Sequence, residues 1–137
     1  MRKIKMLLLI SLLSLYLFTG CEKQKPVIDL ESIDISEIEK IELFGTTGGK
    51  DGHFSCDLSE DERQDFVELL NRVELGNEVN ENDAMADGGV TYYHIYFSNG
   101  DKITISPGPV FKVQDTYYKF NNFDELWDQF VMFNSIG

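Results

Sequence analysis

The fold of this chain is decided by one stretch, Val90-Thr91-Tyr92-Tyr93-His94-Ile95-Tyr96-Phe97-Ser98-Asn99-Gly100-Asp101-Lys102-Ile103-Thr104-Ile105. β-branched and aromatic residues dominate both ends of the stretch, which is the composition typical of strands. The polar segment Ser98–Asp101 between them, with Asn99 followed by Gly100, is a strong hairpin-turn signal. The stretch therefore predicts two adjacent antiparallel strands.

The geometry of this turn determines which side chains share a face, because shifting the pairing by one residue turns every side chain over. A two-residue turn would set both isoleucines of the second strand on the face opposite Ile95. A three-residue loop with Gly100 in the left-handed region instead pairs Ile95 with Ile103 and Tyr93 with Ile105. The second register gathers the apolar residues on one face, so the sequence favours it.

Strand patterns recur on both sides of this hairpin. Further strands are predicted over residues 40–44, 51–57, 110–113 and 116–120. The last two form a second hairpin around Gln114-Asp115, which places Phe111 opposite Tyr118 and Val113 opposite Thr116. Pro107-Gly108-Pro109 separates the two hairpins, since proline cannot continue a paired central strand.

Two helices are predicted. Ser59 and Glu62 have the spacing of a capping box, and an apolar face with helical period follows at Phe66, Leu69, Leu70 and Val73. Asn122 is predicted to cap a C-terminal helix, with Glu125 three residues later. That helix presents an apolar face at Phe123, Leu126, Trp127, Phe130 and Val131. The fold class is therefore α+β: a single domain over residues 36–137, with an antiparallel sheet of hairpins, one helix after the second strand and one C-terminal helix.

The first residues form a secretory leader. Arg2, Lys3 and Lys5 precede an apolar run that is too short for an ordinary membrane span. Leu17-Phe18-Thr19-Gly20-Cys21 then resembles a bacterial lipobox, with Phe18 where that pattern usually has leucine. The resemblance implies cleavage after Gly20 and a diacylglycerol on the Cys21 sulfur. Residues 1–20 are then a signal peptide, and residues 21–35 the lipidated N-terminus and a flexible tether.

Charge narrows the class of partner. The whole chain has a formal charge of −12, and residues 1–20 hold three of its 12 basic residues and none of its 24 acidic residues. The chain from Cys21 onward is thus near −15, which disfavours nucleic acid and anionic bilayers. Membrane attachment is therefore assigned to the lipid on Cys21, on the extracytoplasmic face of the cell membrane. In size and element order the mature part resembles small lipoproteins of Gram-positive bacteria.

Signatures of catalysis and metal binding are missing from the sequence. His53 and His94 belong to no His-Glu-x-x-His motif, and the sequence has neither a Cys-x-x-Cys pair nor a Gly-x-Ser-x-Gly elbow. Cys56 alternates with Phe54 and is predicted to be a small apolar residue on a strand. The sequence therefore predicts no enzyme, no cofactor and no bound metal.

The registers above predict a candidate ligand or partner face on the side of the sheet away from the core. It consists of Tyr92, His94, Tyr96, Lys102, Thr104, Lys112, Tyr117 and Lys119. Tyrosine rings beside lysines suit a saccharide, an anionic wall component or a protein partner. The same residue types also stabilise an exposed sheet that has no ligand.

An acidic segment, Asn77–Asp87, is predicted as a mobile loop. Counted from Asn80, it lacks the sixth-position glycine of an EF-hand, and whether it binds a cation is left open. The leading functional hypothesis is a membrane-anchored, non-catalytic binding or accessory module. The alternative is an extracellular inhibitor or immunity-type protein that acts through this acidic segment.

Overall fold

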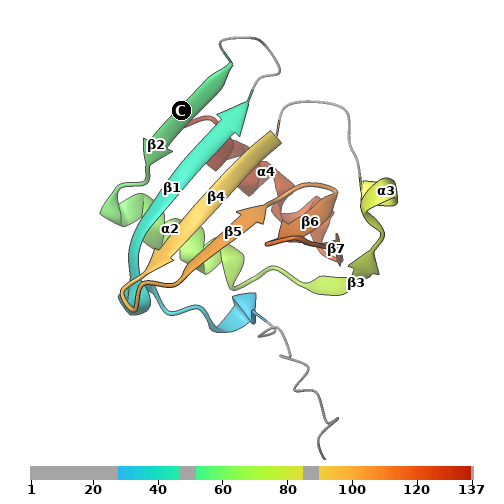
Figure 1. Ribbon diagram of the computed structural model, residues 1–137, viewed down its shortest axis with the longest axis horizontal. Helices are drawn as coiled ribbons and strands as arrows, with labels where there is room; N and C mark the ends of the chain where they lie inside the picture. The colour runs from blue at the N-terminus through green and yellow to red at the C-terminus, as the bar shows by residue number, and fades with distance from the viewer. Residues whose placement is uncertain (1–27, 47–51, 85–89, 137) are drawn as a thin grey trace, which may run out of the picture.

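The computed structural model describes residues 28–46, 52–84 and 90–136 (Figure 1). Its strands form one seven-stranded antiparallel sheet in the order β2-β1-β4-β5-β6-β7-β3. The strands are β1 Ile38–Thr46, β2 His53–Asp57, β3 Leu75–Val79, β4 Val90–Phe97, β5 Lys102–Ser106, β6 Val110–Val113 and β7 Thr116–Phe120. The α-helices are α2 Glu60–Leu70, α3 Glu81–Ala84 and α4 Phe123–Asn134, and two 3-10 turns, η2 Leu30–Ser32 and η3 Ile35–Glu37, precede the sheet. The predicted α+β class is confirmed, with the short α3 as an additional helix.

The β4–β5 hairpin has the predicted three-residue loop. Ile95 pairs with Ile103, and the same register runs from the Tyr93–Ile105 pair to the Tyr96–Lys102 pair. Gly100 has a φ of 91°, which side-chain-bearing residues rarely adopt, and its N–H donates to the Phe97 carbonyl at 3.0 Å. The turn thus sets the register that sorts apolar from polar side chains.

The β6–β7 hairpin is also confirmed. Phe111 pairs with Tyr118, and Val113 pairs with Thr116. The turn residue Gln114 has a φ of 53°, the left-handed value that a tight two-residue hairpin turn requires. Figure 1 shows β6 and β7 crossing the direction of β1 and β4, so the sheet twists strongly along its width.

Strand β3 corrects the prediction of a mobile loop at Asn77–Asp87. Residues 77–79 belong to a paired edge strand, in which Leu75 faces Phe120 and Val79 faces Tyr117. Helix α3 follows, and residues 85–89 lie outside the described residues. A Cβ at Gly76 would lie 2.6 Å from the Asn121 Oδ1, so glycine permits the close approach of β3 to β7.

Helix α2 begins as predicted. The Ser59 Oγ accepts a hydrogen bond from the Glu62 N–H at 3.3 Å, and the Glu62 carboxylate accepts one from the Ser59 N–H at 2.7 Å. All four apolar residues predicted for its face are buried, and Val67 joins them. Phe66 stacks on Tyr93 of β4, with ring centroids 4.3 Å apart. The predicted pairing of Tyr93 with Ile105 is present too.

Helix α4 packs against the sheet through a narrower stripe than predicted. Leu126 and Phe130 are fully buried, whereas Val131 is 40% exposed, so its assignment to the apolar face is wrong. Phe123 and Trp127 are half-buried and stack on each other with centroids 5.0 Å apart. Trp127 therefore packs at the border of the core, as the sequence indicated.

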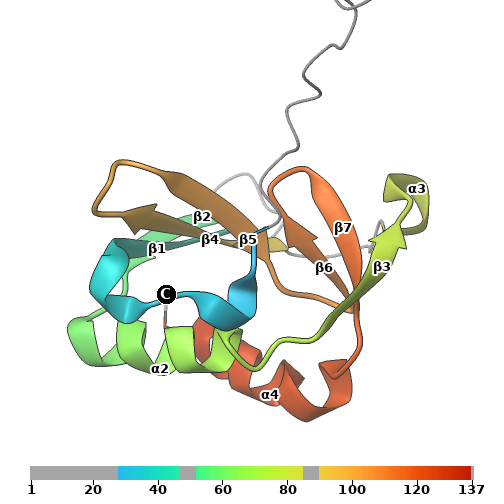
Figure 2. The ribbon, with the colours of Figure 1, turned by 90° about the horizontal axis from the view of Figure 1, so that it is seen from below.

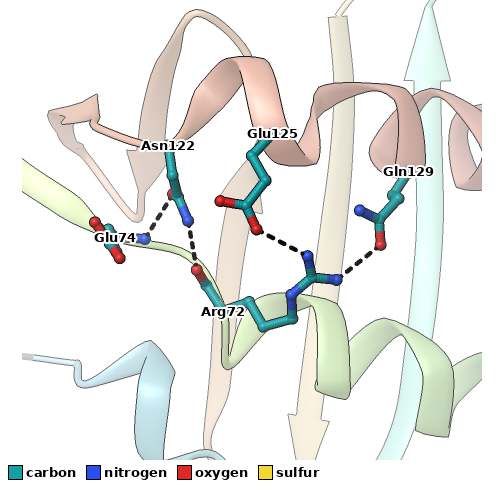
Figure 3. A network of polar contacts seen from close by, with 5 residues as sticks. All are labelled: Arg72, Glu74, Asn122, Glu125 and Gln129. Carbon is teal, nitrogen blue, oxygen red and sulfur yellow. Dashed lines mark hydrogen bonds and ion pairs between the residues drawn. The ribbon is translucent and has the colours of Figure 1, made fainter.

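Asn122 occupies the N-cap position of α4, but its side chain makes no cap hydrogen bond. Its Oδ1 accepts from the Glu74 N–H at 3.0 Å, and its Nδ2 donates to the Arg72 carbonyl at 2.8 Å (Figure 3). The Arg72 guanidinium in turn donates to Glu125 at 3.1 Å and to Gln129 at 2.9 Å. These bonds fasten the segment between α2 and β3 to α4.

The core lies between the sheet and the two longer helices, which cover the same face (Figure 2). Leu30 and Ile33 are 2% and 8% exposed within that core, so the prediction that a flexible tether runs to residue 35 is wrong from Leu30 onward. The polar residues that suggested a tether include two turn caps. The Asp29 side chain accepts from the Glu31 N–H, and the Asp34 side chain accepts from the Ser36 N–H.

The predicted leader, the cleavage point at Gly20, Cys21 and the beginning of the predicted tether lie outside the described residues. Within the described parts of the chain, no helix is long and apolar enough to cross a membrane.

The bridging role of Asn122 can be separated from an ordinary capping role. Asn122→Ala is expected to lower the free energy of unfolding by about 1 to 2 kcal/mol, because two hydrogen bonds to the 72–74 backbone are lost. Asn122→Asp retains a good capping residue but cannot donate to the Arg72 carbonyl, so it is expected to be destabilising as well. Urea unfolding measures both, with Asn77→Ala, an exposed asparagine on β3, as the control. Wild-type stability of Asn122→Asp would show that the bridge contributes little.

Candidate functional site

The side of the sheet away from α2 and α4 is called the outer face here (Figure 2). Strand registers place all eight residues of the predicted face on it, because each alternates with a residue of the core. Its side chains are Lys40, Glu42, Phe44, His53, Ser55, Asp57, Tyr92, His94, Tyr96, Lys102, Thr104, Lys112, Tyr117 and Lys119. A binding role for this face remains a prediction.

Part of the outer face was missed by the sequence analysis. Strands β1 and β2 add Lys40, Glu42, Phe44, Ser55 and Asp57, among other residues. They lie on this face because β1 pairs with β4, which is about fifty residues away in the sequence. No local turn signal in the sequence predicts that pairing. Alternation of polar residues in 40–44 was the available signal, but it does not say which strand lies alongside.

Tyr96 lies at the centre of one half of the face. Its ring is flanked by two ammonium groups, Lys40 Nζ at 5.6 Å and Lys102 Nζ at 5.9 Å from the centroid. Its hydroxyl donates to the Glu42 carboxylate at 3.2 Å. Lys40 also forms an ion pair with Asp57 at 3.1 Å, but both side chains are largely exposed, so that pair adds little stability.

Glu42 accepts two hydrogen bonds on this surface. The Ser55 Oγ donates to it at 2.9 Å, and this bond, followed by that from Tyr96, holds the pKa of the Glu42 carboxyl below its usual value. Partial burial and the neighbouring Glu42 carboxylate raise the pKa of Tyr96. The Glu42 carboxylate is therefore already engaged by its own strand neighbours.

His94 is surrounded by groups that disfavour its protonation. Its Nδ1 lies 2.9 Å from the Thr104 Oγ1, and its ring lies beside that of Phe44, with centroids 6.4 Å apart. Partial burial lowers the pKa of His94 first, and the Lys102 ammonium lowers it further, while Glu42 acts in the opposite direction. His94 is thus held in its neutral form.

The half of the face formed by β5, β6 and β7 has a different electrostatic character. Lys112 lies over the Tyr117 ring at 5.0 Å, and Lys119 is exposed on the same face. Ion pairs among the described residues involve Lys40 and Arg72, so the ammonium groups of Lys102, Lys112 and Lys119 have no carboxylate partner there. This half presents uncompensated positive charge.

The opposite side of the domain is acidic. Helix α2 carries Glu60, Asp61, Glu62, Asp65 and Glu68, and helix α4 carries Asp124, Glu125 and Asp128. The described basic residues outside the outer face are Arg63 and Arg72. In a chain with a net charge of −12, the described lysines therefore lie on the outer face together with Glu42 and Asp57, whereas the helix side is mainly acidic.

The remaining predicted residues do not form a second polar site. Cys56 is an unpaired, half-buried cysteine that faces the core beside Leu43, and burial raises the pKa of its thiol, as expected for a packing residue. Among the described residues, no group of three or more His, Cys, Asp or Glu side chains could hold a metal ion. The question of a cation in Asn77–Asp87 involves residues outside the described part.

The outer face carries several kinds of side chain that could contact a ligand or partner. Flat aromatic rings, hydroxyl groups and ammonium groups lie together on an open strand surface. His94 and Thr104 share a hydrogen bond, as a base and a nucleophile would, but the helix-side clefts at residues 28–31 and 31–35 include neither. No protein-family model, curated protein or solved structure matches the chain.

The environment of His94 predicts a pH dependence of stability. Because its pKa is lowered on folding, the unfolded chain binds the proton more readily, and stability falls as the pH drops below the ordinary histidine value of 6.5. The free energy of unfolding is expected to decrease between pH 7.5 and 5.5, a window above the ordinary pKa of carboxyl groups. The decrease should be smaller in His94→Gln and retained in His53→Gln, in which His94 is intact. Urea unfolding across this range measures it, and an equal decrease in His94→Gln would refute the assignment.

Proposed function

We propose that the mature protein is a lipid-anchored, non-catalytic binding module outside the cytoplasmic membrane, and that its outer face binds the anionic groups of a partner. The partner is a protein segment or a saccharide that bears carboxylates or phosphates. The observation that carries this proposal is that Lys102, Lys112 and Lys119 lack an ion-pair partner among the described residues and share a face with the half-buried rings of Tyr96 and Tyr117, on a domain that is otherwise acidic.

The absence of carboxylate partners for these three lysines among the described residues supports a binding role for them. Ammonium groups on one sheet face could be neutralised easily in a chain with 24 acidic residues, yet the ion pairs among the described residues involve none of these three lysines. A positive patch on an acidic protein attracts anions locally and repels them elsewhere, which orients an approaching partner. Tyr96 and Tyr117 add apolar contact area with a polar end, a combination favoured at binding surfaces.

The lipid anchor is supported by the lipobox at Leu17–Cys21 and by the position of the other cysteine. Cys56 faces the core from β2, so it is poorly placed to serve as an external attachment point. The net charge near −15 from Cys21 onward also disfavours direct adsorption of the mature protein to an anionic bilayer. A covalent lipid supplies the attachment that the surface does not.

Two cysteine variants test the anchor. Cys21→Ser is expected to lose the mass of the diacylglycerol and to leave the membrane fraction, because the acyl chains provide the apolar burial that holds the protein there. The matched Cys56→Ser variant should keep both the lipid and the membrane association. Intact-mass spectrometry and membrane fractionation measure these outcomes. Membrane retention of Cys21→Ser equal to that of the wild type would contradict the proposal.

The binding face is tested with charged polymers in solution. The chain from residue 21 onward, with Cys21→Ser, is expected to bind poly-L-glutamate or polygalacturonate at low salt, in spite of its own negative charge, and not neutral dextran. Lys112→Glu should weaken binding about tenfold, or about 1.4 kcal/mol, whereas Lys25→Glu changes the net charge equally and should have little effect. Binding should weaken as salt is raised, because the charges are exposed.

The two polymers distinguish the source of the anionic groups. Preference for poly-L-glutamate favours a protein partner, and preference for polygalacturonate favours an acidic saccharide. Replacing Lys102, Lys112 and Lys119 together by Glu should abolish binding to either polymer, with circular dichroism confirming the fold. Unchanged binding by this folded triple variant would exclude the outer face as the site.

A further inference from the structure

A cleft of about 960 Å³ opens on the helix side of the sheet, away from the outer face. It lies where three segments meet: residues 28–31, residues 73–76 and the β6–β7 turn at 113–118. Its lining is more apolar than polar and includes Leu30, Val73, Leu75, Val113 and Tyr118, of which Leu75 and Tyr118 are half-buried and the other three are buried. Small-molecule sites typically have volumes of roughly 300 to 1,000 Å³, and this cleft lies near the upper end of that range.

The charged side chains recorded in the lining of this cleft are all acidic, and Gln114 and Thr116 are neutral polar residues beside them. Asp29, Glu31 and Asp115 contribute carboxylates from exposed positions, and the described residues of the lining include no lysine, arginine or histidine. The Asp29 carboxylate accepts the Glu31 N–H at 3.1 Å, which uses one of its oxygens and leaves the other for a ligand. An apolar interior with carboxylates around it is complementary to a cation that carries an apolar body.

The cleft is also preformed, because hydrogen bonds hold its walls. At the β6–β7 turn, Gln114 donates from its N–H to the Thr104 carbonyl at 2.8 Å, and its side chain donates to the Lys102 carbonyl at 3.2 Å. On the opposite wall, the Glu74 N–H is bound by Asn122 at 3.0 Å. Walls fixed in this way reduce the ordering cost when a ligand binds.

We propose that this cleft binds a small organic cation with an apolar body. The ammonium or guanidinium group lies at Asp115 and Glu31, and the body contacts Val113, Tyr118 and Leu30. The site is independent of the outer face, since Val113 and Tyr118 alternate with Lys112 and Tyr117 and therefore point to the other side of the β6–β7 hairpin.

The proposal is tested with two fluorescent probes that share an aromatic body and differ in charge. Dansylcadaverine ends in an ammonium group, and dansyl-6-aminohexanoate ends in a carboxylate. The chain from residue 21 onward with Cys21→Ser is expected to bind the ammonium probe at least about tenfold more tightly, measured by the blue shift of dansyl emission. Equal affinity for the two probes would show an unselective apolar surface and overturn the proposal.

Variants locate the probe in the cleft. Asp115→Asn keeps a residue suited to the turn but removes one carboxylate, and should weaken binding of the ammonium probe about three- to tenfold. Asp128→Asn, an equal change on the exposed side of α4, should leave it unaltered. Thr116→Trp places a bulky side chain at the cleft lining and should abolish binding. Unchanged binding in Thr116→Trp, with an unaltered circular dichroism spectrum, would exclude the cleft.

The residues before Ile28 are another candidate occupant of the cleft, and chains of two lengths distinguish them from the cation. The packed part of the protein from Ile28 onward has a continuous hydrophobic core of its own, so a chain that begins at residue 28 is expected to fold. That chain and the one from residue 21 should bind dansylcadaverine equally. Binding by the shorter chain alone would mean that the residues before Ile28 occupy the cleft, which would overturn the proposal.

Discussion

The left-handed conformation of Gly100 is the constraint on which the two faces of the sheet depend. With a φ of 91°, it closes a three-residue loop and pairs Ile95 with Ile103. A shift of one residue would turn the isoleucines of β5 toward solvent and its lysine and threonine toward the core. Burial of the β5 isoleucines and exposure of Lys102 therefore have one physical cause. Strands β1 and β6 then extend the same sorting to both sides of this hairpin.

Local chemistry made the hairpins and α2 predictable from sequence. Gly100, the Ser59–Glu62 capping box and the two-residue turn at Gln114 each act within a few residues of chain, and the structure has all three. Strand β3 could not be found in this way. Its Gly76-Asn77-Glu78 sequence has no apolar alternation, and it becomes a strand because β7 offers a free edge to pair with.

Tertiary contacts also gave some side chains other partners than the local sequence predicted. Asn122 has the sequence position of a helix cap, yet its side chain bonds to the 72–74 backbone, which approaches only in the folded chain. Lys40 and Glu42 also lie in the candidate site because of a tertiary contact, the pairing of β1 with β4. The eight residues predicted from two hairpins do lie on one face of the sheet, and the residues that β1 and β2 add to it could be found only from the structure.

The two proposed surfaces are consistent with the charge of the domain as a whole. Because the chain from Cys21 onward has a net charge near −15, an anionic partner has one favourable approach, to the lysines of the outer face, whereas a cation is attracted to most other directions. Specificity for a cation must therefore come from shape, and the cleft supplies it through the apolar surface around Leu30 and Tyr118.

A lipid on Cys21 would relate the cleft to the membrane. Only six residues, 22–27, lie between Cys21 and Ile28, and a fully extended chain over these seven residue steps spans at most roughly 25 Å. Ile28 is itself part of the cleft lining, so the anchor would hold the cleft within that distance of the lipid interface. An amphiphilic cation concentrates at such an interface, because its apolar body enters the bilayer and its charge remains among the head groups. The short connection would thus hold the cleft close to where its proposed ligand accumulates.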